Sequence, residues 1–175
     1  MPFTAEADSL NCSILGPDAV AGTAEFDLYV DQLVTEMTVK TGQKCTAIRR
    51  AFVPTAVLDD VQAAVVDRLA RVVVGNPAEP SVRMGPLASL EQREEVRRSL
   101  KALLDAGDLA YGDPDHVEVV GADSERGAFI SPILIRCDDA GPARAPRGRG
   151  VRPGEHADGI FVDGRGDLAG CPRAG

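Results

Sequence analysis

The sequence predicts an α/β fold in which helices pack on a sheet, and two patterns in the first 140 residues predict it. Apolar residues recur every three or four positions in three segments, which is the spacing of amphipathic helices. Short runs rich in Val and Ile, closed by Gly or Pro, alternate with these segments and are typical of strands. Such alternation indicates a layered α/β domain, and 175 residues correspond to about one domain.

The individual elements are justified by their end signals. Thr23 is placed as an N-cap, Gly42 stands where a helix normally stops, and Ser89 with Gln92 forms a capping-box pattern. In chain order we predict a strand at 10–15, a helix with its apolar face over 26–37, a strand at 47–53, a helix over 58–72, a helix after residue 89 that closes at residue 107, and a strand at 129–135.

Composition excludes several classes of function. The formal net charge of -8 and the pI near 4.8 argue against a nucleic-acid partner, which requires clustered Lys and Arg. No apolar run reaches the roughly 18 residues of a membrane span, and no signal sequence opens the chain, so we expect a cytoplasmic protein without a membrane partner. The cysteines follow no metal-ligand spacing, and we expect Cys12 and Cys137 in the core.

Cys45 is the exception among the cysteines because it lies in a predicted loop just past a helix end. A thiol is a useful nucleophile only as the thiolate, which cationic neighbours favour. Lys44, Arg49 and Arg50 are the candidates for that role. The loop position also leaves the sulfur accessible and the backbone N–H of Cys45 free to face a developing oxyanion.

The run Gly42-Gln43-Lys44-Cys45 resembles the active-site motif of the aldehyde dehydrogenase superfamily, a helix followed by Gly-Gln-x-Cys. The family's second landmark is a glutamate about forty residues upstream, and Glu6 lies 45 − 6 = 39 positions before Cys45. Thr38 departs from the pattern, because the family usually has an apolar or aromatic residue there. The residues after Glu6 depart from the usual Leu-Gly-Gly-Lys run as well.

With this second departure, the sequence is similar to one branch of the superfamily. That branch is the dehydrogenase half of a bifunctional protein of phenylacetate degradation. That branch oxidises a ring-opened acyl-CoA semialdehyde. The similarity extends from residue 3 to about residue 140. It rests on the runs Phe3-Thr4-Ala5-Glu6-Ala7-Asp8-Ser9-Leu10-Asn11, Met37-Thr38-Val39-Lys40, Cys45-Thr46-Ala47-Ile48-Arg49-Arg50, Val72-Val73-Val74-Gly75-Asn76-Pro77, Met84-Gly85-Pro86-Leu87 and Leu90-Glu91-Gln92-Arg93.

The resemblance implies a partial catalytic domain of three-layer α/β type over residues 1–140. It implies that Cys45 attacks the aldehyde and that Glu6 is the general base that activates water against the thioester. The implied cofactor is NAD or NADP. The family places its dinucleotide domain before the glutamate, so the cofactor site is expected to be incomplete and this chain inactive alone. The implied partners are a small aldehyde or a CoA-linked semialdehyde, and the intact family protein is expected to be a homo-oligomer.

Residues 141–175 differ from the rest, because Gly, Pro, Arg and Asp dominate without an apolar period. We expect a disordered tail. A frameshift would explain the change: moving the reading frame by one base lets residues 146–159 spell HEVEAFGPVSTLM and residues 162–167 spell STDEAI. The superfamily carries Glu-x-Phe-Gly-Pro at this place. Two alternatives stay open, an aldehyde dehydrogenase for another semialdehyde and a truncated product without function.

Overall fold

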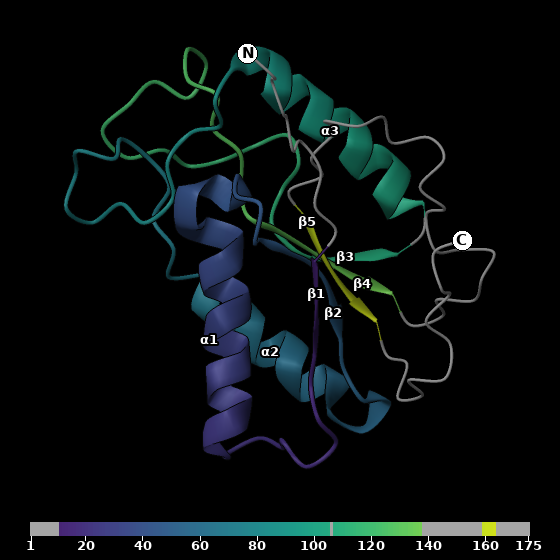
Figure 1. Cartoon of the computed structure of the whole chain (residues 1–175). Coiled ribbons are helices and arrows are strands. Elements are labelled where there is room, and N and C mark those ends of the chain that lie inside the picture. Colours follow the sequence, from purple (N-terminus) through teal and green to yellow (C-terminus); the bar gives the residue numbers. More distant parts are fainter. Residues whose placement is uncertain (1–10, 106, 138–158, 164–175) are drawn as a thin grey trace, which may run out of the picture.

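The computed structural model describes residues 11–105, 107–137 and, as a strand, Gly159–Asp163. The described helices and strands form an α/β arrangement in which a sheet lies between helices (Figure 1). Its elements are β1 (Asn11–Ile14), α1 (Ala24–Thr38), β2 (Ile48–Phe52), α2 (Leu58–Leu69), α3 (Leu90–Leu104), β3 (Asp108–Tyr111), β4 (Ile133–Cys137) and β5 (Gly159–Asp163). The short 3₁₀ helices η1 (Val39–Gly42) and η2 (Thr55–Val57) precede β2 and α2.

The described strands form one sheet in the order β1-β2-β5-β4-β3. All neighbours are parallel except β3 and β4, which pair antiparallel at one edge. Parallel strands need helical crossovers on the faces of the sheet, which explains why helices and strands alternate along the chain. The fold class predicted from the sequence is confirmed.

The two faces of the sheet carry separate apolar clusters. Helices α1 and α2 pack together on one face with Val53 and Leu134, and the segment around α3 packs on the other with Ile133 and Ile135 (Figure 1). Successive residues of a strand point to opposite faces, so β4 supplies both clusters. Its burial on both sides follows from the continuous apolar run Ile133-Leu134-Ile135.

Side-chain caps fix where the two long helices begin. The hydroxyl of Thr23 accepts from the backbone N–H of Phe26, and Ser89 accepts from the N–H of Gln92 in the same way. Both caps satisfy a helix donor that has no partner within the helix. The Gln92 amide oxygen accepts from the N–H of Ala88 rather than from that of Ser89, so the predicted capping box is displaced by one residue.

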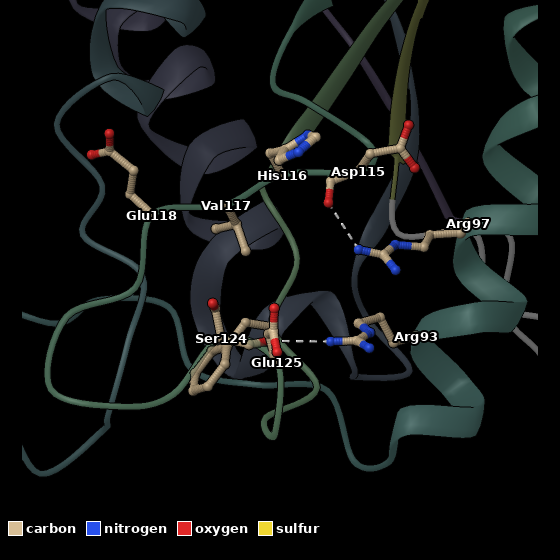
Figure 2. Close-up of a pocket in the computed structure, with 9 residues that line it drawn as sticks. Arg93, Arg97, Asp115, His116, Val117, Glu118, Ser124 and Glu125 are labelled. Atoms are coloured by element: carbon tan, nitrogen blue, oxygen red, sulfur yellow. Dashed lines mark hydrogen bonds between the residues drawn. The ribbon is translucent and has the colours of Figure 1, made fainter.

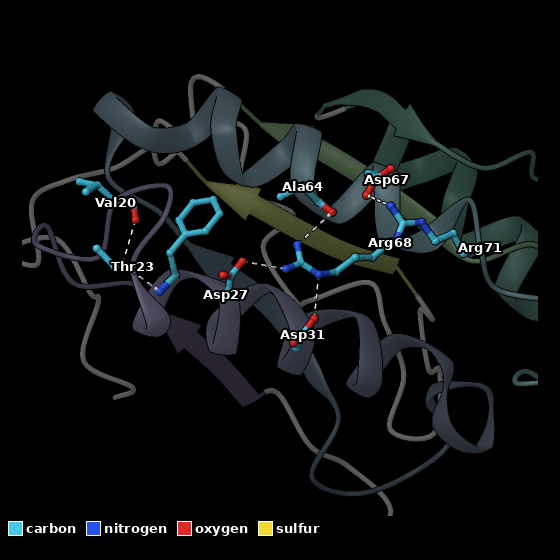
Figure 3. Close-up of polar contacts among 9 residues, drawn as sticks. Val20, Thr23, Asp27, Asp31, Ala64, Asp67, Arg68 and Arg71 are labelled. Atoms are coloured by element: carbon cyan, nitrogen blue, oxygen red, sulfur yellow. Dashed lines mark hydrogen bonds and ion pairs between the residues drawn. The ribbon is translucent and has the colours of Figure 1, made fainter.

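Charged side chains join the outer surfaces of α1 and α2 (Figure 3). The guanidinium of Arg68 on α2 pairs with Asp27 at 2.9 Å and with Asp31 at 2.7 Å, both on α1. Figure 3 also shows Arg71, just past the end of α2, beside Asp67 of that helix. These exposed pairs contribute little stability individually, about 0–1 kcal/mol each. The apolar faces of the two helices supply the buried packing between them.

The structure corrects three sequence-based predictions about strands and burial. The strand predicted at 129–135 begins only at Ile133, because Pro132 has no N–H to donate to a ladder. Strand β3 was not predicted, since Asp108–Tyr111 is a short edge strand with little apolar character. Cys12 was expected in the core but is exposed, because it shares with the exposed Ile14 one face of β1, at the edge of the sheet.

No strand was predicted in the segment 141–175 either. In the structure, Gly159–Asp163 forms β5 between β2 and β4. The sequence reason is the run Ile160-Phe161-Val162, which has high β propensity although it is too short to show a period. The correction concerns these five residues; the rest of the predicted tail lies outside the described residues. Over the described part of the chain, no helix is long and apolar enough to cross a membrane.

Candidate functional site

Cys45 lies in a surface turn between η1 and β2, where its side chain is exposed. Helix α1 ends at Thr38, and η1 turns the chain before the cysteine. The backbone N–H of Ala47 then donates to the carbonyl oxygen of Lys44 at 3.1 Å, which closes a turn with Cys45 inside it. The loop position predicted for Cys45 is confirmed, and its sulfur is accessible to a small molecule.

The turn before Cys45 has an unusual backbone. Lys40 and Thr41 have φ angles of 54° and 57°, and Gly42 follows with 70°. Left-handed conformations cost non-glycine residues about 1–2 kcal/mol each, so two in succession must be held by other contacts. Strain of this kind clusters at sites where a side chain has to be aimed. This turn replaces the simple helix stop that Gly42 predicted.

Several polar contacts hold the strained turn in place. Thr41 is 1% exposed, and its hydroxyl donates to the carbonyl oxygen of Gly85 at 2.8 Å. The buried guanidinium of Arg49 donates to the carbonyl oxygen of Gly42 at 3.0 Å. Gln43 donates to the carbonyl of Lys40 at 3.0 Å and accepts from the N–H of Ala88 at 2.9 Å. The turn is therefore fastened both to β2 and to the segment 85–88.

The turn that contains Cys45 is also fastened from β1. The side-chain amide of Asn11 donates to the carbonyl oxygens of Cys45 at 2.6 Å and of Ala47 at 3.2 Å. Sequence analysis identified neither Asn11 nor Thr41 as part of the site. Both act through backbone groups, and such contacts leave no motif in a sequence.

The cationic residues predicted to face the thiol have other contacts. The ammonium of Lys44 lies 2.7 Å from a carboxylate oxygen of Glu36, and Arg49 binds the Gly42 carbonyl. Neither contact involves Cys45. Thr38, which departs from the family's motif, is buried, and its hydroxyl donates back to the carbonyl of Val34 at 2.8 Å. The polar side chain at this position is thereby satisfied within its own helix.

The second predicted catalytic residue, Glu6, lies outside the described residues. His116 is exposed, and its Nδ1 lies 3.7 Å from a carboxylate oxygen of Asp113. Backbone N–H groups of Asp115 and His116 lower the pKa of the Asp113 carboxyl. Among the described residues no group of His, Cys, Asp and Glu is placed to hold a metal ion.

A cleft of about 420 Å³ opens beside the strained turn. Lys40, Thr41 and Gln43 line one side of it, and Arg83 with the segment 85–88 lines the other. Its lining includes two cationic side chains and no carboxylate. The cleft therefore shares its wall with the loop that carries Cys45.

A second cleft, of about 590 Å³, is lined by residues of α3 and of the following loops (Figure 2). Arg93 donates to the carbonyl of Gly127 at 2.8 Å, and Arg97 donates to that of Asp115 at 3.0 Å. These two arginines are half-buried and hold the loops that follow α3. None of the residues lining this cleft belongs to the Cys45 loop.

The first turns of α1 and α2 are unfavourable for the diphosphate of a dinucleotide. Such groups bind where a strand leads into a helix N-terminus with free N–H groups and no negative charge. The first turn of α1 carries Glu25 and Asp27, and the first turn of α2 carries Asp59 and Asp60. Thr23 already caps α1. Each acidic pair would repel a diphosphate, so neither strand-to-helix connection serves as a phosphate site.

Comparison with known sequences decides the family. The profile of the "Aldehyde dehydrogenase family" matches residues 9–141. The chain belongs to the aldehyde dehydrogenase family. A 3,4-dehydroadipyl-CoA semialdehyde dehydrogenase of Aromatoleum evansii is 48% identical over 139 residues, which cover 79% of this chain and 27% of that protein. A putative aldehyde dehydrogenase of Staphylococcus saprophyticus is 31% identical over 128 residues, 73% of this chain and 26% of that protein.

Solved structures agree on the fold of the aldehyde dehydrogenase family. A betaine aldehyde dehydrogenase of Staphylococcus aureus, in complex with NAD+, superposes with a TM-score of 0.67 and 23% identity over 90% of this chain and 29% of that one. An aldehyde dehydrogenase of Pseudomonas syringae, in complex with NAD+ and octanal, superposes with a TM-score of 0.65 and 22% identity. The match covers 91% of this chain and 30% of that one. The chain thus spans about a quarter to a third of the length of these relatives.

Proposed function

We propose that this chain carries the nucleophile of an aldehyde dehydrogenase that oxidises a CoA-linked semialdehyde to the carboxylic acid with NAD or NADP. The single observation that carries the proposal is an exposed cysteine on a loop fastened at several points, within a sequence of this family. A nucleophile must be accessible and held in one direction, and this loop provides both.

The proposed chemistry assigns one step to each of two side chains. The Cys45 thiolate attacks the aldehyde carbon and forms a carbon–sulfur bond, and the backbone N–H of Cys45 stabilises the oxyanion. A nicotinamide, when bound, would supply the acceptor for the hydride that leaves this carbon, so that a thioester would remain on Cys45. Water then attacks the thioester after Glu6 removes its proton, which releases the acid and regenerates the thiolate.

The substrate class rests on the similarity to the Aromatoleum evansii protein, whose name states that it acts on 3,4-dehydroadipyl-CoA semialdehyde. A CoA thioester carries phosphates. The cleft beside the turn has Lys40 and Arg83 and no carboxylate in its lining, which is compatible with an anionic substrate. The broader proposal, oxidation of some aldehyde through Cys45, does not depend on this choice.

Alkylation of the cysteines tests the role of Cys45. Cys12 is also exposed and serves as the internal control within the same chain. We expect iodoacetamide to modify Cys45 roughly tenfold faster than Cys12 at neutral pH, because the loop holds the Cys45 side chain accessible and in one direction. Peptide mass spectrometry gives both rates. Equal rates would contradict the proposed nucleophile.

Protection by aldehydes tests the substrate class in the same experiment. A CoA-linked semialdehyde that forms a thiohemiacetal with Cys45 blocks its alkylation and leaves Cys12 unaffected. A free dicarboxylic semialdehyde of the same carbon skeleton is the comparison. Protection by the CoA-linked compound at the lower concentration supports the CoA proposal, and equal protection by both favours an aldehyde dehydrogenase for a free semialdehyde.

The proposal also includes the expectation that this chain turns over no aldehyde alone. Acidic pairs occupy the first turns of α1 and α2, which is unfavourable for a diphosphate at those two helix ends. The test is NADH or NADPH formation monitored by absorbance, with an aldehyde and each dinucleotide. Saturable turnover by the chain would show that a complete cofactor site exists within it.

A further inference from the structure

One side chain links strand β1 to both ends of the turn that contains Cys45. The amide nitrogen of Asn11 lies 2.6 Å from the carbonyl oxygen of Cys45 and 3.2 Å from that of Ala47. We propose that Asn11 is a positioning residue that fixes the backbone of Cys45 for attack on the aldehyde. The inference rests on the function proposed above for Cys45.

The strand pairing explains how Asn11 reaches the turn. β1 and β2 pair in parallel, with Asn11 opposite Ile48 and Cys12 opposite Arg50, so the register shifts by one residue between them. An irregularity of this kind re-aims neighbouring side chains. Arg49 lies at this register shift, and its guanidinium holds the Gly42 carbonyl. The bulge therefore places two clamps, Asn11 and Arg49, on the loop of the cysteine.

The chemistry of the contact requires an amide at this position. The amide nitrogen has two hydrogens and donates to two carbonyl oxygens, which are two residues apart in the same turn. Holding the Cys45 carbonyl fixes the rotation of the peptide that follows the cysteine. An aspartate has the same shape but only acceptor atoms when ionised, so its charge would face two carbonyl oxygens.

Asn11 is near the second proposed catalytic group in the sequence, because it follows Glu6 by 11 − 6 = 5 residues. In the structure, the contacts of Asn11 tie the start of β1 to the turn of the proposed nucleophile. Because the contact uses backbone oxygens of the turn, it leaves the sulfur itself accessible.

The test uses the whole chain, with cysteine labelled by ¹³C at the carbonyl carbon, which gives one resonance for each of the four cysteines. The variants are Asn11→Ala and Asn11→Asp. Asn76→Asp is the matched control, because the Asn76 side-chain oxygen accepts from the N–H of Ala78 at 3.0 Å and an aspartate oxygen preserves that bond. The control adds the same charge and preserves the hydrogen bond from the Ala78 N–H.

We expect both Asn11 variants to move the Cys45 carbonyl resonance and to leave those of Cys137 and Cys171 in place. Protection of Cys45 by the aldehyde should fall roughly three- to tenfold, as for the loss of one or two ordinary hydrogen bonds. Asn76→Asp should change neither quantity. If Asn11→Ala fails to fold, Asn11→Ser, which keeps one donor, replaces it.

Each outcome decides a separate statement. An unmoved Cys45 resonance overturns the clamp. A moved resonance with unchanged protection shows that Asn11 is structural only, which overturns its positioning role. Absence of protection in the unsubstituted chain overturns the proposed function itself, whatever the resonance does.

Discussion

The hydroxyl of Thr41 donates a hydrogen bond to the carbonyl oxygen of Gly85 at 2.8 Å, across 44 residues of sequence. Thr41 has a left-handed backbone with φ 57° and is buried. The bond joins the turn before Cys45 to the segment that precedes α3. The strained turn is therefore held by tertiary contacts, and weakening them should affect both stability and the loop of the cysteine.

Replacement of Thr41 by valine tests this relationship. Valine is also β-branched, so the backbone strain stays while the donor to Gly85 is lost. We expect the free energy of unfolding to fall by about 1–3 kcal/mol, measured by urea denaturation.

Thr38→Val is the matched control for that substitution. Thr38 is also buried, but its hydroxyl bonds the carbonyl of Val34 within the same helix. That carbonyl has a backbone partner in the helix as well, so the loss should stay below about 1 kcal/mol. Equal losses in the two variants would show that the Thr41 bond contributes nothing particular.

Lys40→Gly should stabilise the chain. Lys40 is exposed and has a φ of 54°, which glycine adopts without steric cost. We expect a gain of about 1 kcal/mol in the free energy of unfolding. We expect Lys101→Gly to lower the free energy of unfolding by about 1 kcal/mol, because Lys101 is exposed in helix α3 and glycine is a poor helix former. A loss in both variants would mean that the left-handed turn is not strained.

Tyr29 makes the stability sensitive to alkaline pH. Burial raises the pKa of its phenol far above the ordinary value, an effect only partly opposed by its hydrogen bond to Ser13. Above about pH 10 the unfolded chain loses this proton while the folded chain retains it. Stability must then fall as pH rises, by about 1.4 kcal/mol per pH unit for this one group.

Tyr29→Phe isolates that effect. The phenol oxygen lies 3.4 Å from the carbonyl oxygens of Ser13 and Phe52, so at neutral pH the variant should lose about 0.5–1.5 kcal/mol. Between pH 10 and 11.5 the difference between the two chains should narrow or reverse, as measured by urea denaturation at each pH. A constant difference across this range would show that Tyr29 does not titrate on unfolding.

Sequence reasoning predicted the fold class and the long helices because these depend on period and caps. The apolar stripes of α1 and α3 and the caps Thr23 and Ser89 are local signals, and the structure confirms them. The short edge strand β3 and the left-handed turn at Lys40 depend on tertiary contacts. The accessible loop of Cys45 was predictable from the helix end, whereas the clamp by Asn11 required the register shift between β1 and β2.

The final prediction concerns the DNA that encodes residues 140–147. The family match ends at residue 141, although the chain continues to residue 175. Residues 146–159 read one base later can spell HEVEAFGPVSTLM, in which Glu-Ala-Phe-Gly-Pro has the family's pattern. We expect resequenced genomic DNA to carry a one-base insertion or deletion between codons 140 and 147. The insertion or deletion is counted against the reading frame that encodes this series. The codons around Cys45 serve as the internal control, because the match to the family is continuous there. If the gene does restore the frame, the corrected chain should extend the family match beyond residue 141. The frameshift would be excluded if the genomic sequence showed no one-base difference and if no shifted frame after residue 141 encoded Glu-x-Phe-Gly-Pro.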